Sequence, residues 1–257
     1  MPTFCRHNRF EANCPICSRE KAAAAPPAPR RPVARTSPKR STAVRTRQVS
    51  READDGFRTD RVPGVRGTGE AERLARALSA AADRLEPPGP WPEVATTPDL
   101  DAATERAFVL AAGSEDGLPA FREWAARAGS PSAAFRGEAA WTPQRRFARL
   151  FERLSLPGFG RGPRFALLAG LGAAGLYELE ADSLHLGGED ATTVAAKRAL
   201  VSGDTVLLER RARALAEAAG LPLAALDRGL ADWNAPGALA GERTSPGLDD
   251  VRTALGL

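Results

Sequence analysis

Apolar side chains recur every three or four residues from about residue 70 onward, which places them on one face of successive helices. Leu74, Leu78 and Leu85 belong to the first such run, and the segment from Pro87 to Pro90 would end it. Asp99 can cap a second helix, and Thr142 can cap a fourth with Pro143 as its first residue. Including these two, the helices predicted after the first one cover residues 99–113, 118–128, 142–154, 165–171, 190–201, 204–219 and 223–233. Because no strand pattern of convincing length and no internal repeat occurs, the predicted fold class is all-α.

The chain divides into three predicted zones. Residues 1–19 contain all three cysteines, and residues 70–257 form the helical domain. Residues 20–69 between them are rich in Ala, Pro, Arg, Ser and Thr and carry few large apolar side chains. Such a segment cannot bury enough surface to offset its ordering entropy, so we expect a disordered basic linker. We expect residues 235–257 to form a loosely attached tail with one short helix.

Charge is distributed unevenly over the 257 residues. Residues 21–51 carry +9 and residues 1–20 carry +1, so the net charge of +4 leaves −6 for residues 52–257. A basic linker attracts phosphate backbones without regard to sequence, although a solvated linker of biased composition remains the alternative. There is no run of 18 apolar residues and no apolar stretch after the charged first ten residues. We therefore expect a cytoplasmic protein without a membrane span or secretory signal.

The first zone contains a metal-binding pattern. Cys5, His7, Cys14 and Cys17 follow the spacing C-x-H-x6-C-x2-C, which can place four ligands tetrahedrally around one Zn²⁺. A Cys₃His site with no open position is structural, so we expect a zinc knuckle over residues 1–19. Free thiols on a flexible tail are the alternative, and a redox role lacks the surrounding βαβ pattern.

A Gly- and Pro-rich segment separates two of the predicted helices. Residues 156–160 read L-P-G-F-G, and Gly158, Gly160 and Gly162 allow a tight turn that brings backbone N–H groups against a phosphate. Arg161 and Arg164 are candidate phosphate contacts, because residues 136–164 contain seven Arg and two Glu. An ordinary interhelical turn with arginines on a solvated face remains the alternative.

This segment resembles the helix-hairpin-helix DNA glycosylase superfamily, in which an L-P-G-h-G hairpin is followed by a catalytic aspartate. Here Asp182 lies 22 residues after Gly160, within the sequence E-A-D-S-L-H. The resemblance implies that double-stranded DNA is the partner, that the target base is flipped out of the stack, and that no small-molecule cofactor is needed. It implies that the Asp182 carboxylate stabilises positive charge on the sugar and that His185 shares the site. A surface carboxylate and a packed histidine are the alternative interpretations of these two residues.

One departure from the family pattern limits the chemistry that the resemblance implies. Bifunctional members carry a Schiff-base lysine two residues after the second glycine, where this chain has Gly162. The resemblance therefore implies a monofunctional DNA glycosylase, a hydrolase of N-glycosyl bonds with a role in DNA repair or modification. Together with the N-terminal cysteine pattern, the body looks closest to the predicted alpha-glutamyl/putrescinyl thymine pyrophosphorylase clade 3 branch, which implies a hypermodified thymine as substrate.

Two other functions stay open at this point. The first is a non-catalytic DNA-binding module that combines the zinc knuckle with the hairpin. The second is a helical interaction protein whose zinc knuckle binds a protein partner, and the acidic body would suit this role. Three large aromatic residues, Trp141, Tyr177 and Trp233, are either base-stacking groups or core residues, and core packing is the preferred interpretation.

Overall fold

The computed structural model describes residues 54–85, 89–235 and 247–257. These residues form helices and no strand, which confirms the all-α prediction for the part of the chain that is described. The helices are α2 (Thr68–Ala82), α3 (Trp91–Ala95), α4 (Leu100–Ala112), α5 (Leu118–Ala126), α6 (Pro131–Arg136), α7 (Pro143–Arg153), α8 (Arg161–Ala173), α9 (Ala191–Leu200), α10 (Thr205–Ala218), α11 (Leu223–Asn234) and α12 (Leu248–Leu255). None of these helices is long and apolar enough to cross a membrane.

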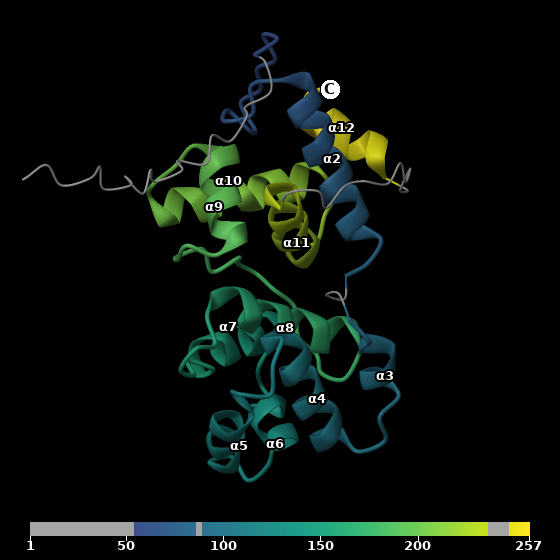
Figure 1. The fold of residues 1–257 in the computed structure, drawn as a ribbon, viewed down its shortest axis with the longest axis vertical. Helices are drawn as coiled ribbons and strands as arrows, with labels where there is room; N and C mark the ends of the chain where they lie inside the picture. Colours follow the sequence, from purple (N-terminus) through teal and green to yellow (C-terminus); the bar gives the residue numbers. More distant parts are fainter. Residues whose placement is uncertain (1–53, 86–88, 236–246) are drawn as a thin grey trace, which may run out of the picture. The chain divides into compact units, whose positions relative to one another are not determined.

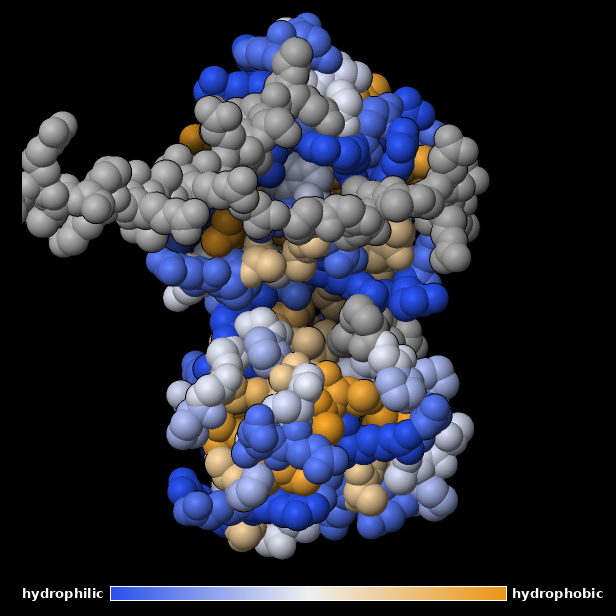
Figure 2. Space-filling view, viewed as in Figure 1, coloured by the Kyte–Doolittle hydropathy of each residue, from blue (hydrophilic) through white to orange (hydrophobic). Residues whose placement is uncertain are grey.

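The helices pack in two groups that follow the order of the chain only in part (Figure 1). In one group, α4 packs against α3, α5, α6 and α8, and α7 packs against α8. In the other, α11 packs against α2 and α9, α12 packs against α2, and α10 contacts α9, α11 and α12. A single cluster of buried apolar side chains contains residues from both groups. The space-filling view shows hydrophobic residues among hydrophilic ones over the group formed by α3 to α8 (Figure 2).

Side-chain caps explain where several helices begin. The carboxylate of Asp99 accepts a hydrogen bond from the backbone N–H of Asp101, and the hydroxyl of Thr142 accepts one from Arg145. Asp190 and Asp204 cap α9 and α10 in the same way. Each cap satisfies an N–H group that has no partner within its own helix. The predicted caps at Asp99 and Thr142 are therefore confirmed.

The boundary of the folded body differs from the prediction at the end of the linker. Residues 54–69 were assigned by composition to a disordered linker, but Val62 and Val65 are fully buried. The backbone N–H of Gly64 also donates to the carbonyl of Ala199 at 2.9 Å, which ties this segment to the end of α9. Because these valines are buried and Phe57 also packs against the core, residues 54–69 belong with the helical body.

The C-terminal segment is also more firmly attached than its composition suggested. Helix α12 packs against α2, and Val251 and Leu255 are buried. The Arg252 side chain additionally pairs with Glu72 of α2 at 2.7 Å. The short helix was predicted, but the expectation of a loose tail is wrong for residues 247–257.

The sequence patterns missed the shortest helices. Helices α3 and α6 have five and six residues, too few to show a helical period. Helix α8 begins at Arg161 rather than at residue 165, because Gly162 and Pro163 are both tolerated in the first turn of a helix. Residues 177–186, whose type the pattern did not decide, form an irregular segment between α8 and α9.

Candidate functional site

Residues 154–160 form a tight turn between α7 and α8. The N–H of Phe159 donates to the carbonyl of Leu156 at 3.1 Å, with Pro157 and Gly158 at the two central positions. Gly158 has a φ of 73°, which the third position of a type II turn requires and which glycine adopts without steric cost. Phe159 is buried against the ring of Phe108 at 4.7 Å, whereas Pro157, Gly158 and Gly160 are exposed. The turn is thus anchored by one aromatic side chain and presents its glycines to solvent.

The Arg164 side chain stabilises this turn through hydrogen bonds to backbone carbonyls. Its guanidinium donates to the carbonyl of Phe151 at 3.0 Å and to the carbonyl of Phe159 at 3.4 Å, and it lies 4.8 Å from the centre of the Phe151 ring. Partial burial lowers the pKa of Arg164. The side chain therefore connects the end of α7 to the turn instead of reaching toward solvent.

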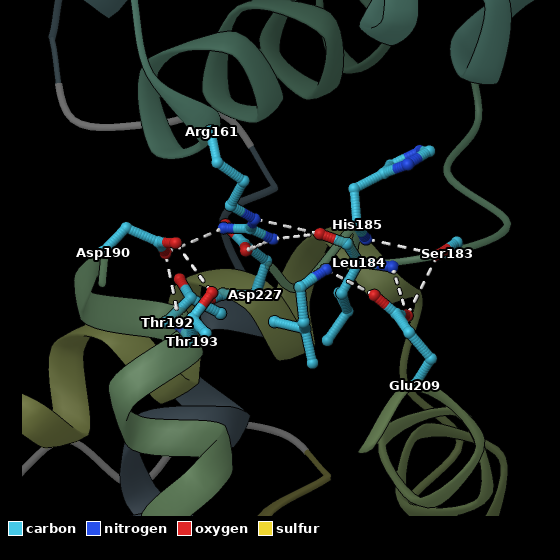
Figure 3. A network of polar contacts seen from close by, with 10 residues as sticks. Arg161, Ser183, Leu184, His185, Asp190, Thr192, Thr193, Glu209 and Asp227 are labelled. Atoms are coloured by element: carbon cyan, nitrogen blue, oxygen red, sulfur yellow. Dashed lines mark hydrogen bonds and ion pairs between the residues drawn. The ribbon is translucent and has the colours of Figure 1, made fainter. Parts of the chain in front are cut away.

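Arg161, the first residue of α8, lies in a buried network of polar groups (Figure 3). Its Nε donates to the carbonyl of Leu184 at 3.0 Å, and its guanidinium pairs with Asp190 at 3.3 Å and with Asp227. Only 9% of the Arg161 side chain is exposed, and burial raises the pKa of Asp227. Arg161 thus joins the hairpin to the start of α9 and to α11.

These contacts change the expected roles of the two arginines. Both guanidinium groups were candidates for phosphate contacts, but both are engaged by groups within the protein. At the start of α8 the groups suited to a phosphate are the backbone N–H groups of Arg161 and Gly162, since the first turn of a helix leaves its N–H groups without internal partners and Pro163 has none.

The segment that carries Asp182 is held by side chains from α10. The Glu209 carboxylate accepts hydrogen bonds from the Ser183 hydroxyl at 3.0 Å, from the Leu184 N–H at 3.0 Å and from the Leu186 N–H (Figure 3). The Arg213 guanidinium donates to the backbone carbonyl of Asp182 at 2.5 Å. The backbone around Asp182 is therefore restrained, while its side chain is exposed.

Asp182 lines a cleft of about 440 Å³ between the two helix groups. One wall comes from Gln144 in the first turn of α7, whose amide donates to the Glu180 carboxylate at 2.7 Å. The opposite wall comes from α10 and from residues 220–223 at the start of α11. The cleft contains one amide and four charged side chains, those of Gln144, Glu180, Asp182, Arg213 and Glu217. The first helix of the hairpin and Asp182 thus share one cleft.

His185 occupies a different place from the one expected. Its ring stacks on Phe151 of α7 with the ring centres 4.0 Å apart, and it is not among the residues that line the cleft. Among the described residues, its Nε2 is buried without a hydrogen-bond partner, and burial lowers the pKa of the imidazole. Its φ of 52° is uncommon for a residue other than glycine. The structure therefore supports the packed-histidine interpretation of His185.

Other predicted residues have simpler outcomes. Trp141, Tyr177 and Trp233 are buried, as the preferred core interpretation states, and the Tyr177 hydroxyl lies 2.6 Å from the Thr104 hydroxyl. The predicted zinc ligands Cys5, His7, Cys14 and Cys17 lie outside the described residues. Within the described ranges, no group of three or more His, Cys, Asp or Glu side chains is arranged to hold a metal ion.

No sequence pattern points to the residues that surround Asp182 in space. Glu209 and Arg213 lie on α10, more than 25 residues along the chain, within a charged run that resembles any solvated helix face. Gln144 is an unremarkable polar residue in the first turn of α7. Their contribution depends on the packing of distant helices.

Comparisons with known proteins add no relative to this description. No family model matches the chain, and no curated protein and no solved structure matches it significantly.

Proposed function

We propose that the protein is a monofunctional DNA glycosylase that cleaves the N-glycosidic bond of a modified base, with Asp182 as its catalytic residue. The observation that carries this proposal is the shared cleft: Asp182 and Gln144, from the first helix of the hairpin, line the same hollow. Gln144 lies in the first turn of α7 and the hairpin turn follows the end of this helix, so DNA bound along the helix would bring a flipped base close to an exposed carboxylate.

The cleft has a suitable size and lining for this task. Its volume of about 440 Å³ falls within the range of small-molecule sites, roughly 300 to 1,000 Å³. The Gln144 amide and the Glu180 carboxylate can form hydrogen bonds with the edge of a base. These groups would fix the orientation of the base while its sugar lies next to Asp182.

The chemistry assigned to Asp182 is electrostatic. Cleavage of an N-glycosidic bond builds positive charge on the sugar, and a fixed carboxylate nearby stabilises that charge or orients the attacking water. The hydrogen bond from Arg213 to the Asp182 carbonyl and the bonds from the next residues to Glu209 restrain the backbone at Asp182 and directly after it, which reduces the reorganisation needed during the reaction. With Gly162 at the position of the Schiff-base lysine, the product would be an abasic site in an intact strand.

A non-catalytic DNA-binding module is the second candidate. The position of His185 favours it, because the ring packs on Phe151 and supplies no acid or base group to the cleft. In that case the turn would still bind a backbone phosphate, and Asp182 would be an ordinary surface carboxylate.

Base release from DNA distinguishes the two candidates. Duplexes that carry damaged bases and hypermodified thymines are incubated with the wild-type chain, with Asp182→Asn and with Glu189→Gln, and the released bases are identified by mass spectrometry. Glu189→Gln is a matched control, since Glu189 is exposed on the same segment, lies outside the cleft and loses the same charge. We expect one base to be released by the wild type and by the control but not by Asp182→Asn. DNA binding without release of any base would favour the binding module.

A further inference from the structure

Three exposed arginines follow one another along the outer face of α7. Arg145, Arg149 and Arg153 are spaced four residues apart, so they form a continuous row along the helix. We call these three residues the α7 arginine row. Arg153 is the last residue of α7, and the row therefore ends where the exposed turn with Gly158 and Gly160 begins.

The opposite face of α7 is fixed in the protein core. Phe147, Leu150 and Phe151 are buried, and Arg146 is buried with its guanidinium donating to the carbonyls of Arg136, Trp141 and Glu178. Helix α7 is thus amphipathic, with one face packed in the core and the opposite face charged and exposed.

The arginines of the row are weakly held by their neighbours. Arg149 pairs with Glu152 at 3.1 Å, but half or more of both side chains is exposed, and such pairs contribute little. Arg153 lies 5.2 Å from the centre of the Trp141 ring. Among the described residues, Arg145 makes no side-chain hydrogen bond or ion pair. The row therefore differs from Arg161 and Arg164, whose guanidinium groups are engaged inside the protein.

The dimensions of the row fit a nucleic-acid strand. Eight residues of helix rise about 12 Å, and a DNA strand presents one phosphate for roughly every 3.4 Å along the duplex axis. The row can consequently meet several phosphates of one strand. The row ends at Arg153, next to the turn that leads into the N–H groups at the start of α8.

We propose that the α7 arginine row is the phosphate-binding surface for duplex DNA, and that Arg161 and Arg164 hold the hairpin in shape without contacting DNA. This inference rests on the proposed function for its choice of partner, but it requires only binding and no catalysis. It also gives Glu152 a definite effect: its carboxylate neutralises part of the row and opposes binding.

The test is the salt dependence of DNA binding by the full chain. Fluorescence anisotropy with an unmodified duplex is recorded between about 50 and about 200 mM salt. For Arg145→Gln/Arg149→Gln/Arg153→Gln, the slope of log K against log salt concentration should become shallower by about 3, and the affinity should fall on the order of 100-fold. Glu152→Gln should bind several-fold more tightly than the wild type, because it frees Arg149.

A second triple variant controls for net charge. Arg106→Gln/Arg122→Gln/Arg127→Gln also removes three exposed arginines, which lie on α4 and α5 or at the end of α5 and pair with Glu93, Glu105 and Glu123. It should leave the slope unchanged to within about 1. Should the α7 triple variant fail to fold, Arg145→Gln alone must lower the slope by about 1.

Each remaining outcome decides the inference. An unchanged slope in the α7 variants, or an equal loss in the control triple, would overturn it, as would a wild-type chain that does not bind the duplex. A shallower slope in a protein that releases no base would support the α7 arginine row and reject the glycosylase activity. Failure of the two proposals is therefore distinguishable.

Discussion

Replacement of Arg161 by Met tests whether the buried network joins the hairpin to α9 and α11. The guanidinium pairs with Asp190 and Asp227, whose side chains are 19% and 14% exposed, and it donates to the carbonyl of Leu184. Methionine preserves much of the apolar volume of the side chain but removes every donor. Both carboxylates and one carbonyl then lose their charged partner.

The size of the effect follows from this burial. Removal of one partner from a buried ion pair costs about 3 to 5 kcal/mol, because the other charge stays buried without compensation. The lost hydrogen bond to Leu184 is part of that figure and contributes about 1 kcal/mol. For a folded body of this size, the midpoint of thermal unfolding should fall on the order of 10 °C.

The deficit should depend on pH. Burial raises the pKa of Asp227 above its ordinary value of 3.8, so its favourable contribution is present below that value and is lost as pH rises through the folded pKa. Without Arg161 this pKa rises further, because the attraction that opposes burial is gone. The loss of stability in Arg161→Met should therefore be smallest near about pH 4 and largest near about pH 7.

Urea unfolding followed by far-ultraviolet circular dichroism measures the deficit at both pH values. The double variant Arg161→Met/Asp227→Asn serves as the control, because it removes the more buried of the two uncompensated carboxylates and should be more stable than Arg161→Met by at least about 1 kcal/mol at neutral pH. A deficit below about 1 kcal/mol at neutral pH, an equal deficit at both pH values, or a double variant with no recovery would refute the reasoning.

Three further predictions concern other parts of the chain. Gly170→Ala should destabilise the fold by about 1 to 3 kcal/mol in urea unfolding, because its Cβ would lie 2.3 Å from the buried Trp91 ring, whereas Gly162→Ala, with its nearest neighbour at 4.0 Å, should cost nothing. The full chain should bind one zinc ion, measured by elemental analysis, and Cys14→Ser should lose it; a wild-type chain without zinc would contradict the Cys₃His assignment. Borohydride should trap no covalent complex with DNA, since Gly162 replaces the Schiff-base lysine, and a trapped adduct would point to a different amine nucleophile.

The fold class and the long helices were accessible from the sequence because their signals are local. The caps at Asp99 and Thr142 lie within three residues of the N–H groups that they satisfy, and the apolar period of α10 and α11 is visible over a dozen residues. The burial of Val62 and Val65 could not be predicted from local sequence in the same way. It depends on contacts with a helix end more than a hundred residues later.

The candidate site was only partly accessible for the same physical reason. The turn was predicted because Pro157 and Gly158 encode their own backbone conformation. The roles of Arg161 and Arg164 could not be assigned from charge alone. The same local sequence allows a guanidinium at a helix start to face either solvent or buried carboxylates. Only the packing of α9 and α11 places Asp190 and Asp227 around Arg161.

The central claim, that Asp182 acts on a base held in the cleft, is tested most directly by counting abasic sites at saturation. Duplex DNA carrying the base identified by the release assay is fully bound by either the wild type or Asp182→Asn, and alkaline cleavage then reports the abasic sites formed. The account predicts abasic sites with the wild type alone, at equal DNA occupancy. Equal numbers of sites with both proteins would contradict a catalytic role for Asp182, and bound wild type without any sites would contradict the glycosylase itself.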